Sequence, residues 1–216
     1  MISHARLLPL RMTGPCIYDG REHGEGVLKV ENLMWLLPAV FMLHDFEEII
    51  MMRPWVNRNA DFLRERFPRL SNRILGHYKK LSTSSFALAV SEEFVIIAAV
   101  TFLAVEHGWY AAWGGVLLGF FAHIIVHLVQ FLVVRRYAPM IITSIPAALY
   151  CVYAVNYLLT AGYTTWQALW PWTLFFIAFV AVNILLVHRM AARFEQWLRR
   201  YGKQEVGVFN QENIIE

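Results

Sequence analysis

Five long apolar windows dominate this chain and constrain its fold more than any other feature. None of them contains a lysine or an arginine, and each is about as long as a helix must be to cross a bilayer, about 20 residues. A segment inside lipid must satisfy its own backbone groups, which a helix does. The windows are Leu33–Met52, Ser82–Val105, Trp109–Val134, Met140–Leu159 and Trp170–His188. We therefore predict an all-α, polytopic membrane helix bundle with about five transmembrane helices.

The composition excludes the other broad classes of protein. The chain is 58% hydrophobic and 16% charged, whereas a soluble domain carries about 25% charged residues. So much apolar surface also excludes a disordered chain, and two cysteines cannot form a disulfide framework. We predict a poorly ordered N-terminal extension at 1–32, the membrane bundle at 33–188 and a basic tail at 189–216.

The basic residues predict the orientation of the bundle. Fifteen of the 19 lysines and arginines lie at 53–81, at 135–139 and in the tail at 189–216. The other two connections, 106–108 and 160–169, contain none. With five spans, all fifteen fall on one side of the membrane, and the positive-inside rule makes that side cytoplasmic. We therefore expect the N-terminus outside and the C-terminus in the cytoplasm.

The connection between the first two windows has helical periodicity without being long and apolar enough to span. Its apolar residues recur among arginines at i, i+4, i+7 and i+11, and Pro68 is expected to bend it. These residues are Leu63, Phe67, Leu70 and Ile74. We predict a cytoplasmic amphipathic segment at the membrane interface that meets anionic lipid headgroups rather than nucleic acid.

Five acidic residues inside the windows carry the functional argument. They are Asp45, Glu47, Glu48, Glu92 and Glu93. An acidic side chain at the centre of a spanning helix costs about 2.5–3.5 kcal/mol, and no window contains a basic residue other than histidine. The acids are therefore protonated, or they reach water, or a bound cation supplies the missing positive charge.

Histidines accompany these acids at helical spacing. The first window has His44, Glu47 and Glu48 at i, i+3 and i+4, which places them on one helix face. The third window has an i, i+4 histidine pair, a spacing that lets one helix chelate a metal, followed by a glutamine at i+7. These three residues are His123, His127 and Gln130.

Depth in the membrane favours one common site. Counted from the cytoplasmic ends of the windows at about 1.5 Å per residue, the histidines and glutamates fall in one slab, roughly 6–17 Å deep. We predict a metal site; a proton relay without metal and polar packing between helices are the alternatives. The predicted ligands are His44, Glu48, Glu92, His123 and His127, and the predicted catalytic residues are Glu47 and Glu93. Glu92 and Glu93 are adjacent and point about 100° apart, so which of them faces the site stays open.

The chemistry of the candidate ligands limits which metal ions the site can bind. Nitrogen and carboxylate ligands without thiolate fit Zn, Fe or Mn better than Cu(I) or an iron–sulfur cluster. The number of candidate ligands fits one or two divalent ions per chain, with a glutamate left over as base in the first case. Asp45 lies about 100° from His44 and is expected to face another helix or to support a ligand.

The run Leu43–Ile49, which reads LHDFEEI and follows Trp35-Leu36-Leu37-Pro38, resembles the bacterial membrane proteins named for their HXXEE motif. Glu92–Glu93, His123 and His127 are similar to polar positions of that family. The resemblance covers about residues 30–190. It implies a helical bundle in the bacterial inner membrane with a suspected metal or active site and no established activity.

These observations favour a membrane-embedded metal-dependent enzyme, with hydrolysis of a lipid or another lipophilic substrate as the first hypothesis. The histidines would supply nitrogen ligands, Glu48 and one of Glu92 and Glu93 would complete or bridge the site, and Glu47 would orient water or act as base. A di-iron-type oxidase at the same site is one alternative, and a metal-ion or proton carrier is another. Haem-based electron transfer and a non-catalytic scaffold also remain. The oligomeric state is open.

Overall fold

The structure is a computed structural model that describes residues 29–80 and 82–212. Over these residues it is all-α, which confirms the predicted fold class. The helices are α1 (Val30–Arg58), α2 (Ala60–Arg66), α3 (Pro68–Lys80), α4 (Thr83–His107), α5 (Tyr110–Val134), α6 (Ile141–Thr160) and α7 (Trp166–Glu212). Residues 1–28 of the predicted extension lie outside the described part, and α1 includes the last residues of that predicted range.

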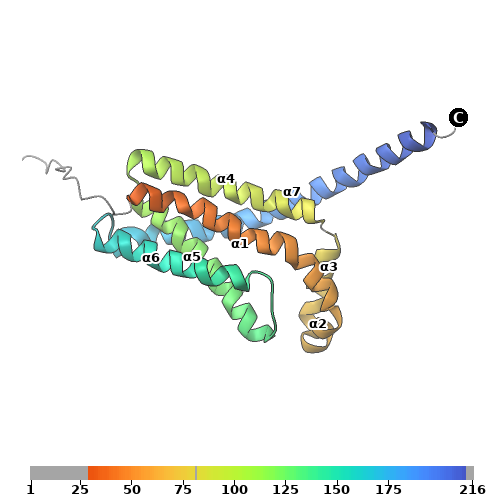
Figure 1. Ribbon diagram of the computed structural model, residues 1–216, viewed down its shortest axis with the longest axis horizontal. Helices are drawn as coiled ribbons and strands as arrows, with labels where there is room; N and C mark the ends of the chain where they lie inside the picture. Colours follow the sequence, from red (N-terminus) through yellow and green to blue (C-terminus); the bar gives the residue numbers. More distant parts are fainter. Residues whose placement is uncertain (1–28, 81, 213–216) are drawn as a thin grey trace, which may run out of the picture.

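The long helices lie side by side as one bundle (Figure 1). Helix α5 packs against α7, α6, α4 and α1, while α1 packs against α4 and α6. The core follows these contacts: Trp113, Leu117 and Ile124 of α5 are fully buried, as are Leu37 of α1 and Leu158 of α6. This packing turns one face of α1 and one face of α5 toward each other.

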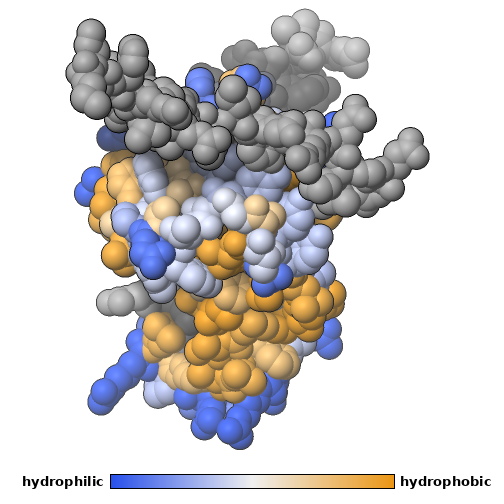
Figure 2. All heavy atoms as spheres, turned by 90° about the vertical axis from the view of Figure 1, so that its left-hand side faces the viewer, coloured by the Kyte–Doolittle hydropathy of each residue, from blue (hydrophilic) through white to orange (hydrophobic). Residues whose placement is uncertain are grey.

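Four helices are long and apolar enough to cross a membrane: α4, α5, α6 and the part of α7 at Trp166–Tyr201. The remaining predicted span, Leu33–Met52, lies within α1, which packs in the same bundle but carries three acids within two turns. The lipid-facing surface that such a bundle needs is present, since large apolar side chains such as Leu149 and Leu174 are exposed. Figure 2 shows broad hydrophobic surfaces with hydrophilic residues along the lower margin.

The two ends of the bundle differ in their connections. At one end, Gly108 terminates α4 with a φ of 66°, and Gly162 has a φ of 76° in the turn that precedes α7; both lie in the left-handed region that glycine adopts without strain. The opposite end holds α2, α3, the α5–α6 connection and the free end of α7 (Figure 1). The three basic segments therefore share one end, as predicted. That this end is cytoplasmic stays a prediction.

The amphipathic segment is divided into three pieces. Helix α1 continues past the predicted end of its window at Met52, and two short helices follow. The helix is interrupted at Phe67, because helical backbone is disfavoured for a residue that precedes a proline. The predicted bend at Pro68 is therefore confirmed. Leu63 of α2 is buried in a small cluster with Met52 and Val56 of α1.

The predicted last span and the described part of the predicted tail form a single helix, α7, which extends to Glu212. No glycine or proline lies between Pro171 and Gly202 to interrupt it. Glu195 of α7 accepts hydrogen bonds from the backbone N–H of Ser82 at 2.9 Å and from Oγ of Ser85 at 2.7 Å. A carboxylate at the first turn of α4 also interacts favourably with its helix dipole. This contact fixes α7 against α4 at the basic end.

Candidate metal centre

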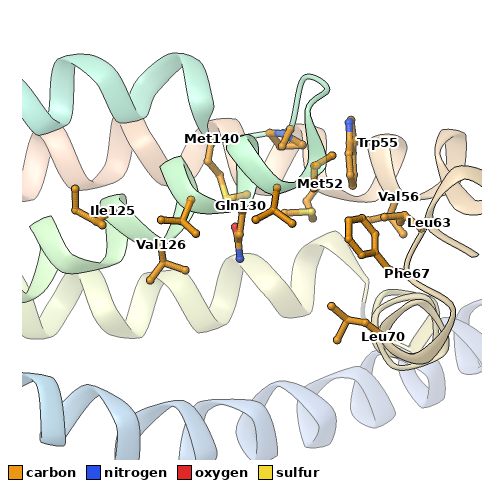
Figure 3. A pocket seen from close by; sticks show the side chains of 15 residues that line it. Met52, Trp55, Val56, Leu63, Phe67, Leu70, Ile125, Val126, Gln130 and Met140 are labelled. Atoms are coloured by element: carbon orange, nitrogen blue, oxygen red, sulfur yellow. The ribbon is translucent and has the colours of Figure 1, made fainter.

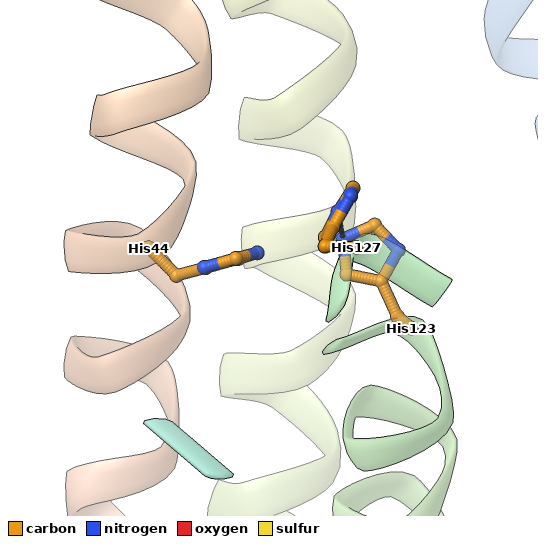
Figure 4. Close-up of side chains that lie close together, drawn as sticks. All are labelled: His44, His123 and His127. Carbon is orange, nitrogen blue, oxygen red and sulfur yellow. Dashed lines mark hydrogen bonds between the residues drawn. The ribbon is translucent and has the colours of Figure 1, made fainter. Parts of the chain in front are cut away.

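Helices α1 and α5 bring three histidines together, although His44 is far in sequence from His123 and His127. One ring nitrogen of each lies within 4.8 Å of the others. The ring centroid of His44 is 5.6 Å from that of His123 and 5.3 Å from that of His127. The i, i+4 spacing places both α5 rings on the face that meets α1, and His44 points toward them (Figure 4). Whether they bind a metal stays a prediction.

Hydrogen bonds fix the ring of His44. Its Nδ1 lies 3.1 Å from Oγ1 of Thr143 on α6, and this hydroxyl donates to the carboxylate of Glu47 at 2.7 Å. Because the hydroxyl proton is used in that bond, Oγ1 accepts from Nδ1–H, which leaves the lone pair of the neutral ring on Nε2. Nε2 is buried without a hydrogen-bond partner among the described residues. An unsatisfied buried polar atom costs about 1–3 kcal/mol.

A second lone pair points into the same space from α5. Nδ1 of His127 is 3.0 Å from Oε1 of Gln130, an amide oxygen that only accepts, so Nδ1 carries the proton. Nε2 of His127 lies 2.8 Å from Nε2 of His123, which therefore donates in the metal-free chain. Histidine ligands in metal sites characteristically donate their other N–H to an oxygen that orients the ring. His44 and His127 both have this arrangement.

Glu47 is joined to His44 through the hydroxyl of Thr143. Its carboxylate accepts from the backbone N–H of Thr143 at 3.0 Å, from its hydroxyl, and from the Tyr137 hydroxyl at 2.9 Å. Partial desolvation and the bond to Glu47 raise the pKa of Tyr137 to about 12, so this group stays a donor at neutral pH. Neither Tyr137 nor Thr143 was among the residues predicted for the site. Thr143 is a polar residue close to the start of its apolar window, and that position is the one sequence feature that could have indicated it.

The acids of the motif separate onto two sides of α1. Asp45 and Glu48 each have a carboxylate oxygen within 4.8 Å of a ring nitrogen of His123, and these three residues form a second group able to hold an ion. Glu48 was predicted as a ligand, whereas Asp45 was expected to face another helix or to support a ligand. The side chains of Asp45 and Glu48 share a face because i and i+3 positions are neighbours on a helix.

The structure separates the adjacent acids of α4. Glu92 accepts a hydrogen bond from Nδ2 of Asn183 on α7 at 3.0 Å and belongs to neither histidine group. Glu93 lines a small cavity of about 90 Å³ together with His123. Of the two adjacent acids, Glu93 therefore lies on the side of α4 that shares a cavity with His123, and like Glu92 it belongs to neither histidine group. Glu92, a predicted ligand, is directed to α7.

A larger apolar cavity lies beside Gln130, the hydrogen-bond partner of His127. It has a volume of about 450 Å³, within the range of small-molecule sites, and is lined by α1, α2, α3, α5 and the α5–α6 connection. Its walls are apolar side chains apart from the indole of Trp55 and the amide of Gln130 (Figure 3). Gln130 thus faces this cavity while its oxygen holds the ring of His127.

Replacing Thr143 with valine is expected to weaken metal binding by 10- to 100-fold, the usual cost of losing a group that orients a ligand. Valine keeps the shape of the side chain but removes the hydroxyl that joins His44 to Glu47. The affinity for Zn²⁺ can be measured by competition with a chelating dye. Thr160→Val, at the far end of α6, is the matched control, and an equal effect of both changes would contradict this role.

Comparison with known proteins identifies one related family. A family described as proteins of unknown function with an HXXEE motif matches residues 35–154. No curated protein and no solved structure matches the chain. The matched region contains the three histidines, the acids Asp45, Glu47 and Glu48 of α1, the acids of α4, and Thr143.

Proposed function

The chain belongs to the HXXEE family, which has no assigned activity, and on that premise we propose that it is a membrane-embedded, metal-dependent hydrolase of a lipid or another lipophilic substrate. The observation that carries the proposal is the buried, unpartnered Nε2 of His44, which points toward two further imidazoles. A divalent metal would supply Lewis-acid chemistry there, activating water and polarising an ester or amide carbonyl.

The donor set fits such an ion. His44, His123 and His127 offer nitrogen, and Glu48 offers a carboxylate oxygen beside His123. Three histidines with a carboxylate nearby suit Zn, Fe or Mn, and no cysteine belongs to either group. An ion there would also replace the proton that now joins His123 to His127 and would give Nε2 of His44 its partner.

The other residues have roles that follow from their positions. Glu93 lines the cavity that also contains His123, so it is placed to accept a proton from water and to return it to a leaving group. Glu47 holds His44 through Thr143 and acts as a positioning residue.

The surroundings of the site favour a lipophilic substrate. Phe41, Phe120, Phe176 and Phe179 line the small cavity beside His123 and Glu93. The larger apolar cavity adjoins the site through Gln130. Substrate sites of this kind combine apolar walls with a few polar groups that fix the reacting bond.

The proposal can be tested on chain purified in detergent without chelators. We expect bound Zn, Fe or Mn by elemental mass spectrometry, and release of fatty acid or headgroup from one member of a panel of lipid esters and amides. Glu93→Gln should retain the metal and lower kcat by about 100-fold or more, the usual contribution of a general base. Glu106→Gln, at an exposed position of the same helix, is the matched control.

Other outcomes would replace the proposal. Bound iron with oxygen consumption and no hydrolysis would assign an oxidase. Metal flux into proteoliposomes without turnover would assign a carrier. Absence of any metal in the purified chain would reject metal-dependent catalysis.

A further inference from the structure

Asp45 is the feature that the three-histidine site does not explain. Its side chain is 3% exposed, and its Oδ2 is buried without a hydrogen-bond partner among the described residues. Leaving a buried carboxylate without a donor or a counter-charge is one of the most destabilising arrangements in a folded chain. A cation bound beside Oδ2 would offset this cost.

The neighbours of Asp45 are further acids and one imidazole. Asp45, Glu48 and His123 each have a ligand atom within 4.8 Å of the other two. Glu93 lies close enough to Asp45 and Glu48 to interact electrostatically with both. Within the described residues, the ion pairs of arginine lie elsewhere. Arg64 pairs with Asp61, and Arg199 pairs with Glu195. Several acids therefore converge without a basic side chain to neutralise them.

The local sequence explains why this second group is separate from the first. Asp45 follows His44 directly, so its side chain points about 100° away around the helix. His44 and Glu47 share the side of α1 that meets Thr143 of α6. Asp45 and Glu48 share another side, where they meet His123. The motif thus serves two neighbouring groups of ligands that have His123 in common.

We propose that Asp45, Glu48 and His123 hold a second divalent metal ion next to the three-histidine site, so that the centre is dinuclear and His123 binds one ion through each of its two ring nitrogens. This inference rests on the proposed function, because it assumes that the histidines bind the first ion. The second site contains more oxygen ligands than the first, which favours Mn²⁺ or Fe²⁺ over metals that prefer nitrogen.

The test counts ions rather than activity. The purified chain is stripped of metal and loaded with Mn²⁺, and the unbound Mn²⁺ is removed. The bound Mn²⁺ is then measured by elemental mass spectrometry and by electron paramagnetic resonance. We expect two Mn²⁺ per chain, with a spectrum broadened by coupling between them. Asp45→Asn should bind one ion and give the sharp hyperfine spectrum of isolated Mn²⁺. Asp61→Asn, an exposed acid of α2, should still bind two.

A stability measurement shows whether the variant is folded. Without metal, Asp45→Asn should unfold at the same temperature as the unchanged chain or at a higher one, because it removes a buried unpaired carboxylate. A single ion in the unchanged chain, retained in Asp45→Asn, would overturn the dinuclear centre and leave the proposed function intact. Two ions in both proteins would overturn the assignment to Asp45. No ion in the unchanged chain would reject the proposed function itself.

Discussion

Replacing His44 with alanine is expected to remove the metal from the three-histidine site and to abolish hydrolysis. The change deletes the imidazole whose Nε2 is buried and aimed at His123 and His127. Because loss of an orienting group already costs 10- to 100-fold in affinity, we expect loss of a ligand to cost about 100-fold or more. The measurement is Zn²⁺ affinity by competition with a chelator, followed by the lipid assay.

His107→Ala is the matched control, because His107 is an exposed histidine at the opposite end of the bundle that stacks on Trp109. It should leave the affinity unchanged. The metal-free form of His44→Ala should remain folded, since the change removes an unsatisfied buried nitrogen together with the ring. Undiminished Zn²⁺ affinity in a folded His44→Ala would exclude His44 as a ligand.

Replacing Gly115 with alanine is expected to destabilise the bundle more than adding a single methyl group at any other position of α5. A Cβ at this position would lie 2.6 Å from Cβ and 2.8 Å from the carbonyl carbon of Trp172 on α7. Backbone atoms cannot rotate away, so the two helices would have to separate. Overpacking usually costs about 1–3 kcal/mol, and we expect the upper part of that range in the free energy of unfolding in detergent.

Gly119→Ala supplies the comparison on the same helix face. Its added Cβ would meet Cβ of Phe176 at 4.0 Å, an ordinary van der Waals contact. We expect a change within about 0.5 kcal/mol, as at sites without strain. Equal destabilisation by both alanines would show that the close approach of α5 and α7 at Gly115 does not limit stability.

The extents of the membrane helices followed closely from the sequence. The predicted window Trp109–Val134 became α5 at Tyr110–Val134, and Met140–Leu159 became α6 at Ile141–Thr160. Bilayer thickness sets the length of an apolar run, and flanking charges and turn residues mark its ends. The last helix continues well past its predicted window Trp170–His188, because the charges after His188 end the apolar run without ending the helix.

The residues of the site were predictable only as far as spacing and depth allow. Helical periodicity and depth together placed His44, His123 and His127 at one level, and the structure brings these three together. The same reasoning could not choose between Glu92 and Glu93, and it left Asp45 outside the centre. Tyr137 and Thr143 were missed because one is in a connection and the other belongs to a helix without histidine.

The sequence by itself determined that this chain forms a bundle of long apolar helices and at what level along each helix its polar groups lie, because hydropathy and rise per residue are properties of single segments. The tertiary structure decided which groups face each other. Rotation of a helix about its own axis changes neither its hydropathy nor the depth of its residues. Only the packing of the helices against one another fixes that rotation. The packing of α1 against α4, α5 and α6 turns Asp45 toward His123, and the packing of α4 against α1, α5 and α7 places Glu93 in a cavity with His123 and Glu92 against Asn183.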